Sequence, residues 1–215
     1  MTASLKPDPP RDEYWNHNVH YHRVVLDAVP YGCDTALDVG CGDGLLAAKL
    51  ASRVGHVTGI DRSAEMIRLA ERRAEDATFV EGDFLTWDPG RTYDFVSCVT
   101  VIHHMDFGAA VTKMAGLLRP GGTLVIIGLP RFATLADHAF AALALPVSLL
   151  YRSLKGGKGA PFGMPMMDAE MKYPEIRQAA RRLLPGAHVR RLLLLRYSIV
   201  WHKLPAPGGD SGAPV

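Results

Sequence analysis

The chain has 215 residues, of which 48% are hydrophobic and 21% are charged, and its formal net charge at pH 7 is +2. A chain of this length and composition suits one globular domain with a substantial core. Its near-neutral charge gives no electrostatic reason to expect a nucleic acid as partner, and we predict none.

Short apolar runs alternate with helical periodicity along most of the chain. Helical spacing of apolar residues separates the runs, and Ser63 is placed to cap one of the predicted helices. A further helix is predicted over 174–184, before the last two runs. The predicted strands are 35–40, 56–61, 77–82, 93–101, 123–129, 187–195 and 196–204.

Apolar strands that alternate with helices predict an α/β protein whose sheet is covered on both faces. Right-handed crossovers then favour a Rossmann-like, doubly wound sheet of seven strands, mostly parallel. Only a junction separates the last two strands, so we expect them to pair as an antiparallel hairpin at one edge.

The pattern also divides the chain. Residues 1–34 form a predicted N-terminal cap segment, of which the first dozen residues, rich in proline and charge, are expected to be flexible. Residues 35–204 form the main domain, and 130–173 is predicted to be a lid-like helical insert within it. The tail 205–215, rich in Pro and Gly, is predicted to be disordered.

Cys33, Cys41 and Cys98 are an odd number of cysteines without the spacing of a metal site. Free thiols and the lack of a signal-peptide pattern at the start predict a cytoplasmic protein. The apolar stretch 132–151 is interrupted by an Asp-His pair, and its uncharged part, 139–151, has only 13 residues. We therefore predict no transmembrane segment, while peripheral contact with a lipid surface stays open.

The sequence "ALDVGCGDG", residues 36–44, places three glycines directly after the first predicted strand. In an open parallel sheet, ligands bind beyond the carboxyl ends of the strands, where glycines allow close approach to the backbone. The dinucleotide pattern G-x-G-x-x-G fails here because Leu45 occupies the place of its third glycine. Asp38 and Asp43 would also repel a pyrophosphate, so the loop favours a ligand with a positive centre or a free amine.

Two further acidic positions follow the next strands. Asp61 ends the second strand, 21 residues after Gly40, where a carboxylate would bind ribose hydroxyls in a nucleotide site. "EGDF", residues 81–84, follows the third strand and offers a carboxylate for an exocyclic amine and an aromatic face for a base. Together these positions predict a nucleoside-binding site.

In these motifs the sequence resembles the class I S-adenosylmethionine-dependent methyltransferases, particularly the broad small-molecule group similar to methyltransferase type 11. "LDVGCGDG" resembles the family's first motif, "GID" its acidic end of the second strand, and "EGDF" its adenine-contacting loop. "LLRPGGTLVI" resembles the turn into the fifth strand. The motifs cover roughly residues 35–130, and the closing hairpin to residue 204 fits the fold.

The resemblance implies S-adenosylmethionine as cofactor, S-adenosylhomocysteine as product, and no metal. It places Asp38 near the methionine amine, Asp61 on the ribose hydroxyls and Asp83 on the adenine amine, with Phe84 or Met66 against the ring. The loop glycines would line the methionine and ribose, although turn and helix-start roles would explain some of the same residues. The implied cofactor-binding residues are Asp38, Gly40, Cys41, Gly42, Gly44, Asp61, Arg62, Met66, Asp83, Phe84 and Val99.

A sulfonium methyl group is already a strong electrophile, so a base is needed only when the acceptor must lose a proton. His103 and His104 follow the fourth strand, beside the expected methyl position, and either could act as a base, as scaffold or as a cofactor contact. His20 is a further candidate base. The Asn/Asp-Pro-Pro-aromatic motif of related enzymes is missing, which disfavours DNA and protein amides as acceptors.

The segment "DEYWNHNVHYHRVVL", residues 12–26, is dense in aromatic and imidazole side chains. It could fold over the cofactor and wall the acceptor, or its rings could simply pack a helix on the sheet edge. Its histidine spacing matches no standard zinc site. The candidate substrate-binding residues are Tyr14, Trp15, His17, Asn18, His20 and Tyr21.

We therefore predict methyl transfer from S-adenosylmethionine to an O, N or C atom of a small organic acceptor, with a secondary metabolite or an apolar or aromatic compound as candidates. The alternatives are a non-catalytic S-adenosylmethionine-binding protein and a nicotinamide-dependent oxidoreductase. A monomer and a homodimer are both compatible with the sequence, and the insert could serve as lid, dimer face or membrane contact.

Overall fold

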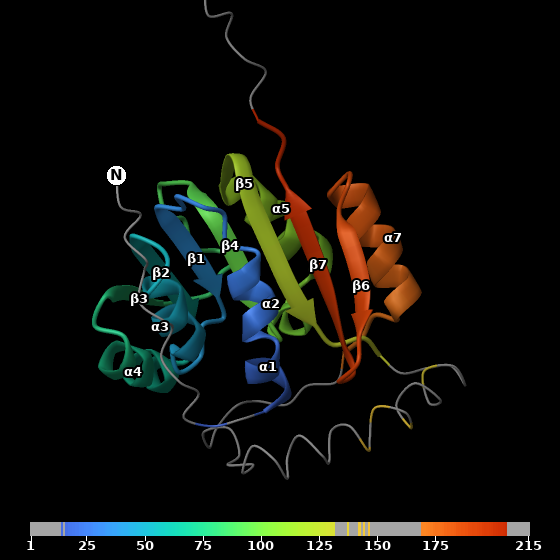
Figure 1. Ribbon diagram of the computed structural model, residues 1–215, viewed down its shortest axis with the longest axis horizontal. Helices are drawn as coiled ribbons and strands as arrows, with labels where there is room; N and C mark the ends of the chain where they lie inside the picture. The colour runs from blue at the N-terminus through green and yellow to red at the C-terminus, as the bar shows by residue number, and fades with distance from the viewer. Residues whose placement is uncertain are drawn as a thin grey trace, which may run out of the picture.

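The computed structural model describes residues 14, 16–131, 137, 142, 144, 146 and 169–205. Seven strands in this part of the chain form one sheet in the order β3-β2-β1-β4-β5-β7-β6 (Figure 1). The strands are β1 Thr35–Val39, β2 His56–Asp61, β3 Ala77–Glu81, β4 Tyr93–Val99, β5 Leu118–Gly128, β6 His188–Leu192 and β7 Arg196–His202.

The helices lie between these strands and before the first of them. They are α1 His17–His20, α2 His22–Asp27, α3 Leu45–Ala51, α4 Ala64–Arg73, the 3-10 helix η1 Ile102–His104, α5 Phe107–Leu117 and α7 Tyr173–Leu183. As predicted, the Ser63 side chain caps α4, with its hydroxyl oxygen accepting a hydrogen bond from the Met66 N–H at 3.3 Å.

The pairing of the strands confirms the predicted mixed sheet. β1 runs parallel to β2 and β4, and β2–β3 and β4–β5 are also parallel pairs. β7 is antiparallel to both β5 and β6, so it lies inside the sheet and β6 forms the edge. Strand order reverses beside β1, which puts the switch point of this doubly wound sheet between β1 and β4.

The fifth strand is longer than the sequence suggested. The sequence "RPGG" predicted a turn before a strand at 123–129, whereas β5 begins directly after α5 at Leu118. A register shift between Tyr93 and Phe95 of β4 accommodates the proline-glycine segment, so β5 pairs with β4 on both sides of it.

Side chains alternate along the strands and bury two separate clusters. Leu124 belongs to the cluster under α5 and α7, whereas its neighbour Val125 belongs to the cluster under α2 and α3. Because both faces of the central strands are covered, these strands are mainly apolar, with Asp38 of β1 and Ser97 of β4 as buried polar exceptions.

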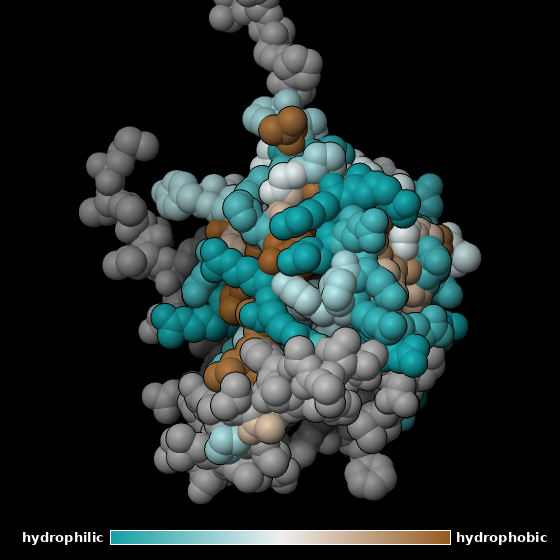
Figure 2. Space-filling model, turned by 90° about the vertical axis from the view of Figure 1, so that its right-hand side faces the viewer, coloured by the Kyte–Doolittle hydropathy of each residue, from teal (hydrophilic) through white to brown (hydrophobic). Residues whose placement is uncertain are grey.

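Helix α7 is amphipathic. Ile176 and Ala180 are buried against the sheet, while Arg177, Arg181 and Arg182 are exposed. Hydrophilic side chains cover much of this side of the molecule (Figure 2). The exposed arginines thus form part of a solvated helix face.

Several predictions fall on residues outside the described ranges: the flexible first dozen residues, Trp15, most of the insert 130–173 and nearly all of the tail 205–215. They stay predictions. Among the helices that the structure does describe, none is both long and apolar enough to span a membrane.

Candidate active site

The predicted site residues converge on one edge of the sheet. The carboxyl ends of parallel strands β1, β2, β4 and β5 meet at this edge. β7 is antiparallel, and the pairing of its Tyr197 with Gly128 at the end of β5 brings the first residue of β7 there too. Arg196, which the sequence did not single out, is therefore a neighbour of the motif residues.

The glycine loop after β1 is shaped by close packing. Gly40 has φ +69°, and a Cβ atom there would overlap the side chain of Val101. Gly44 has φ +77°, caps α3, and a Cβ atom there would lie 2.8 Å from the Cα of Ala70 in α4. The start of α3 and its close packing against α4 thus explain a glycine at position 44 without a ligand, as a helix-start role would. Contact between Gly44 and a cofactor stays a prediction.

Asp61 connects the second strand to the glycine loop. Its Oδ2 accepts a hydrogen bond from the Gly42 N–H at 2.9 Å, and its Oδ1 accepts one from the Ser63 N–H at 2.9 Å. A carboxylate has about four acceptor positions, so each oxygen keeps one for a further donor. This half-exposed side chain therefore fits a pair of ribose hydroxyls.

Asp38 is a buried carboxyl group beside that loop. It is 2% exposed, and its Oδ1 accepts a hydrogen bond from the Ser97 hydroxyl at 2.7 Å. Burial raises the pKa of Asp38 to about 7, with a smaller contribution from the charge of Asp61. A cationic amine beside Asp38 would favour its ionised form.

Asp43, the other loop carboxylate, has its own cationic partner. Its Oδ2 lies 2.5 Å from the Arg73 guanidinium and accepts a hydrogen bond from the Tyr14 hydroxyl at 3.0 Å. Because Arg73 balances the charge of Asp43, Asp43 no longer argues against a pyrophosphate in this loop. That argument then depends on Asp38 and on Leu45 in place of the third glycine. The Tyr14 contact also ties the N-terminal segment to the glycine loop.

The predicted adenine end lies after β2 and β3. Arg62 and Asp83 form an exposed ion pair with 3.8 Å between Nε and Oδ2, and Asp83 also accepts from the Leu85 N–H. Met66 and Phe84 are 5% and 4% exposed, and Phe84 belongs to the main core cluster. Both side chains are thus almost fully buried and expose little surface for stacking, and the adenine contacts stay predictions.

Cys41 and Val99 complete the predicted cofactor set. Cys41 is buried, and burial first, then the charges of Asp38 and Asp61, raises the pKa of its thiol well above the usual value. Val99 ends β4 and is half-buried. Both contribute small uncharged surfaces at the strand ends.

His103 and His104 lie in η1, directly past β4, with their ring centroids 4.1 Å apart. Burial, with smaller contributions from His104 and Arg196, lowers the pKa of His103 to about 4. Burial and Arg62 also lower the pKa of His104. Both rings are therefore mainly neutral at pH 7, a form that can accept a proton.

The N-terminal segment is fastened to the same edge. The Asn18 Oδ1 accepts hydrogen bonds from the Thr100 hydroxyl at 2.9 Å and from the Arg196 NH2 group at 3.1 Å. Thr100 has φ +59°, a strained conformation of the kind that clusters at functional sites. Asn18 thus joins the end of β4 to the start of β7.

The aromatic residues of this segment have mixed roles. Tyr21 is 5% exposed, packs in the cluster under α2 and α3, and accepts a hydrogen bond from the Leu194 N–H at 2.9 Å. It fits the interpretation that rings pack a helix on the sheet. His20 stands edge-on to Tyr21, and both His17 and His20 are half-buried in α1.

Sequence reasoning missed Arg196, although a signal was present. It is the lone charged residue within the apolar run "LLLLRYSIV". A charge in such a run is expected to be buried with a polar partner or to serve a site.

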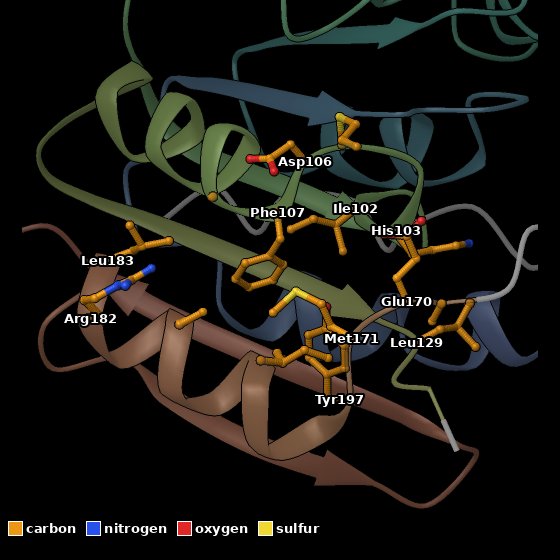
Figure 3. Close-up of a pocket in the computed structure, with 15 residues that line it drawn as sticks. Ile102, His103, Asp106, Phe107, Leu129, Glu170, Met171, Arg182, Leu183 and Tyr197 are labelled. Atoms are coloured by element: carbon orange, nitrogen blue, oxygen red, sulfur yellow. The ribbon is translucent and has the colours of Figure 1, made fainter. Parts of the chain in front are cut away.

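A pocket of about 350 Å³ lies between α5 and α7 and reaches η1. Figure 3 shows His103, Leu129 and Glu170 together at one end of it, with Arg182 and Leu183 at the other. Phe107, Met171 and Tyr197 line the middle. No group of three His, Cys, Asp or Glu residues suited to a metal occurs in the ranges that the structure describes.

A seven-stranded sheet with a glycine loop after β1 and an acidic end to β2 agrees with the resemblance to class I S-adenosylmethionine-dependent methyltransferases. A family model described as a methyltransferase domain matches residues 36–122. The chain is 35% identical over 196 residues to an uncharacterised methyltransferase of Mycobacterium tuberculosis, covering 88% of this chain and 98% of that one. The chain therefore belongs to the methyltransferase family.

Other similarities are more distant. A ubiquinone biosynthesis O-methyltransferase of Xylella fastidiosa is 35% identical over 127 residues, which cover 55% of this chain and 50% of that one. Among solved structures, DesVI of Streptomyces venezuelae matches with a TM-score of 0.60 at 20% identity, covering 88% and 90% of the two chains. The S-adenosylmethionine-bound amino pentose methyltransferase CalS10 of Micromonospora echinaspora matches with 0.59 at 20% identity, covering 86% and 89%. These two structures support the fold.

Proposed function

We propose that the chain methylates an O, N or C atom of a small organic acceptor bound at the carboxyl edge of the sheet, with release of S-adenosylhomocysteine. One observation carries this proposal: the carboxylate of Asp61, with acceptor capacity to spare, lies at the same edge as the histidine pair of η1 and the attached N-terminal segment. A cofactor and an acceptor would meet between these two groups.

The cofactor-binding residues follow from that placement. Asp61 binds the ribose hydroxyls, Asp38 faces the methionine amine, and Asp83 meets the adenine amine, with Phe84 or Met66 beside the ring. The backbone of the loop 40–44 lines the methionine and ribose. S-adenosylmethionine, when bound, supplies a methyl group on a positively charged sulfur.

The chain's own part in the reaction is alignment and exclusion of water. An acceptor lone pair must point along the methyl–sulfur bond for in-line displacement, and a closed site holds it there. The N-terminal segment, fastened through Asn18 and Tyr14, walls one side of this space. His104 or His20 takes the proton from acceptors that carry one, and His103 orients the acceptor.

Similar proteins support a small acceptor. CalS10 is an amino pentose methyltransferase, and the Xylella relative belongs to ubiquinone biosynthesis.

The three cysteines are free and buried, which supports our prediction of a cytoplasmic protein. We keep monomer and homodimer as the two candidate states.

Calorimetric titration of the purified chain with S-adenosylmethionine, S-adenosylhomocysteine and NADH tests the site. We expect micromolar binding of the first two and none of NADH, followed by a methyl-transfer screen of small alcohols, phenols, amines and acids. Binding of NADH alone would overturn the assignment. Turnover with proteins or nucleic acids, but with no small acceptor, would overturn the acceptor class.

A further inference from the structure

Arg196 lies at the active-site edge with its guanidinium largely enclosed by protein. Its NH2 group donates to Asn18, and its NH1 group has one long contact of 3.4 Å with the carbonyl of Leu195. Its Nε atom is buried without a hydrogen-bond partner, and within the described ranges no carboxylate pairs with it.

Such an arrangement costs stability. Burial lowers the pKa of Arg196 to about 10, which reflects the poor solvation of its charge. A buried cation without an anion is unfavourable in a fold, and strained or unsatisfied groups of this kind collect at functional sites. Thr100, with its positive φ, is part of the same cluster through Asn18.

A second unsatisfied group lies nearby. The Nδ1 of His103 is buried and has no partner in the part of the chain described. The charge of Arg196 also contributes to the lowered pKa of His103, which places the two groups in the same region of the site. A guanidinium only donates, and a neutral imidazole can carry its proton on Nδ1, so both groups lack an acceptor.

We propose that Arg196 binds a carboxylate of the acceptor, so that the enzyme methylates small carboxylic acids at another atom while Arg196 holds the acid group. The free Nε–H and the second N–H of NH2 form the planar fork that matches a carboxylate. A single guanidinium with neutral neighbours suits one negative charge better than the two of a phosphate monoester. This proposal rests on the proposed function and names its acceptor class.

The competing explanation is structural: Arg196 would serve only to hold Asn18 and thereby α1. The two explanations differ in stability. If Arg196 is a binding residue, Arg196→Met removes an unpaired buried charge, so the melting temperature stays within a few degrees of the wild type or rises. If Arg196 is structural, the melting temperature falls.

The experiment uses the full chain saturated with S-adenosylhomocysteine. The probes are benzoate, phenylacetate and octanoate, each with its primary amide, and phenyl phosphate, with affinities measured by calorimetry. We expect at least one acid to bind at least tenfold tighter than its amide. In Arg196→Met its affinity should fall about 10- to 150-fold, the range for hydrogen bonds to charged groups. Arg196→Lys, which keeps the charge without the fork, should recover part of this loss.

Arg190→Met is the matched control, because Arg190 carries the same charge on neighbouring β6 and is exposed. It should bind the acids as the wild type does, and all variants should keep their affinity for S-adenosylhomocysteine. The proposal is overturned if no acid binds, if amides bind equally well, if phenyl phosphate binds tighter than every acid, or if Arg196→Met binds acids normally. It is also overturned if that variant melts lower and loses S-adenosylhomocysteine. Failure of the wild type to bind S-adenosylhomocysteine would instead refute the proposed function.

Discussion

The two halves of the active-site edge are built in different ways. In the cofactor half, around β1 to β3, Asp61 accepts hydrogen bonds from the backbone of Ser63 and Gly42, and Asp83 accepts one from the backbone of Leu85. In the acceptor half, Asn18 joins Thr100 and Arg196, which are 82 and 178 residues away in the chain. The first half thus uses backbone donors from the loops that follow β1 to β3, whereas the second depends on side chains that join distant segments.

This difference bears on how each half responds to change. Backbone hydrogen bonds hold the acidic side chains of the cofactor half in place once β1 and β2 have paired. Substitutions in this half should therefore weaken binding of the nucleoside. The acceptor half depends on side chains that bridge distant segments, so its changes should affect turnover and specificity while the fold persists.

Gly40→Val should have the largest effect, because a side chain there meets Val101 and forces a positive φ on a branched residue. Left-handed strain and overpacking together cost roughly 2–6 kcal/mol. Urea unfolding and calorimetry with S-adenosylmethionine should show a destabilised protein without measurable binding. Gly90→Val is the control, since Gly90 also has a positive φ but open space around it. Equal losses in both variants would show that strain alone, not the approach of Val101, matters.

Asp61→Asn should weaken S-adenosylmethionine without unfolding the chain. The amide keeps one oxygen to accept from the backbone, but it loses the charge and one acceptor atom. Loss of charge-assisted hydrogen bonds predicts an affinity about 10- to 150-fold lower. Asp27→Asn, at an exposed carboxylate that pairs with Arg23 on α2, should bind normally in the same calorimetric assay. Normal binding by Asp61→Asn would show that the nucleoside lies elsewhere.

Asp38 should make both stability and binding depend on pH. Its pKa is raised from 3.8 to about 7, so the folded state holds the proton more tightly than the unfolded state. Its contribution is then fully present below pH 3.8 and is lost as pH rises to about 7, by roughly 3–5 kcal/mol in total. Urea unfolding of Asp38→Asn between pH 5 and 8 should lack this slope and should show greater stability than the wild type at pH 8.

The same group should release a proton on binding. A methionine amine beside Asp38 favours its ionised form, so calorimetry at pH 6.5 in buffers of different ionisation enthalpy should detect proton release with S-adenosylmethionine. Asp38→Asn should remove the buffer dependence. Unchanged proton release in that variant would place the amine away from Asp38.

The division also explains what the sequence could predict. The strand end at Asp61 and the cap at Ser63 follow from short-range patterns and are as expected, while β1 ends at Val39, one residue before the predicted end. The pairing of Asp43 with Arg73 was not visible, because the spacing of 30 residues gains meaning only when α3 and α4 pack. The start of β5 was misjudged since a proline-glycine turn normally ends a strand, whereas a bulge absorbs it here.

Arg196 was missed for a related reason. A lone arginine in an apolar run signals a special position, but its neighbours Asn18 and Thr100 come from other regions, so the run alone does not show that it belongs to the site. Phe84 shows a different limit: the motif suggests a ring that faces the adenine, the structure has the ring 4% exposed in the main core cluster, and its contact with a cofactor stays a prediction. Periodicity predicts which residues are buried far better than it predicts which buried residues serve a ligand.

Substitutions of the histidines in the acceptor half should change turnover and leave cofactor binding unchanged. His104→Ala and His20→Ala should keep the affinity for S-adenosylmethionine and lower kcat, by about 10²-fold or more where the residue is the base and less where it only orients the acceptor. Burial and Arg62 lower the pKa of His104, so the acid limb of the kcat profile should have its midpoint below pH 6.5. Arg62→Gln removes the positive charge and should move this midpoint upward, while His104→Ala should abolish the limb. A profile that keeps its midpoint in Arg62→Gln would show that His104 is not the base, and would leave His103 and His20 as the candidates.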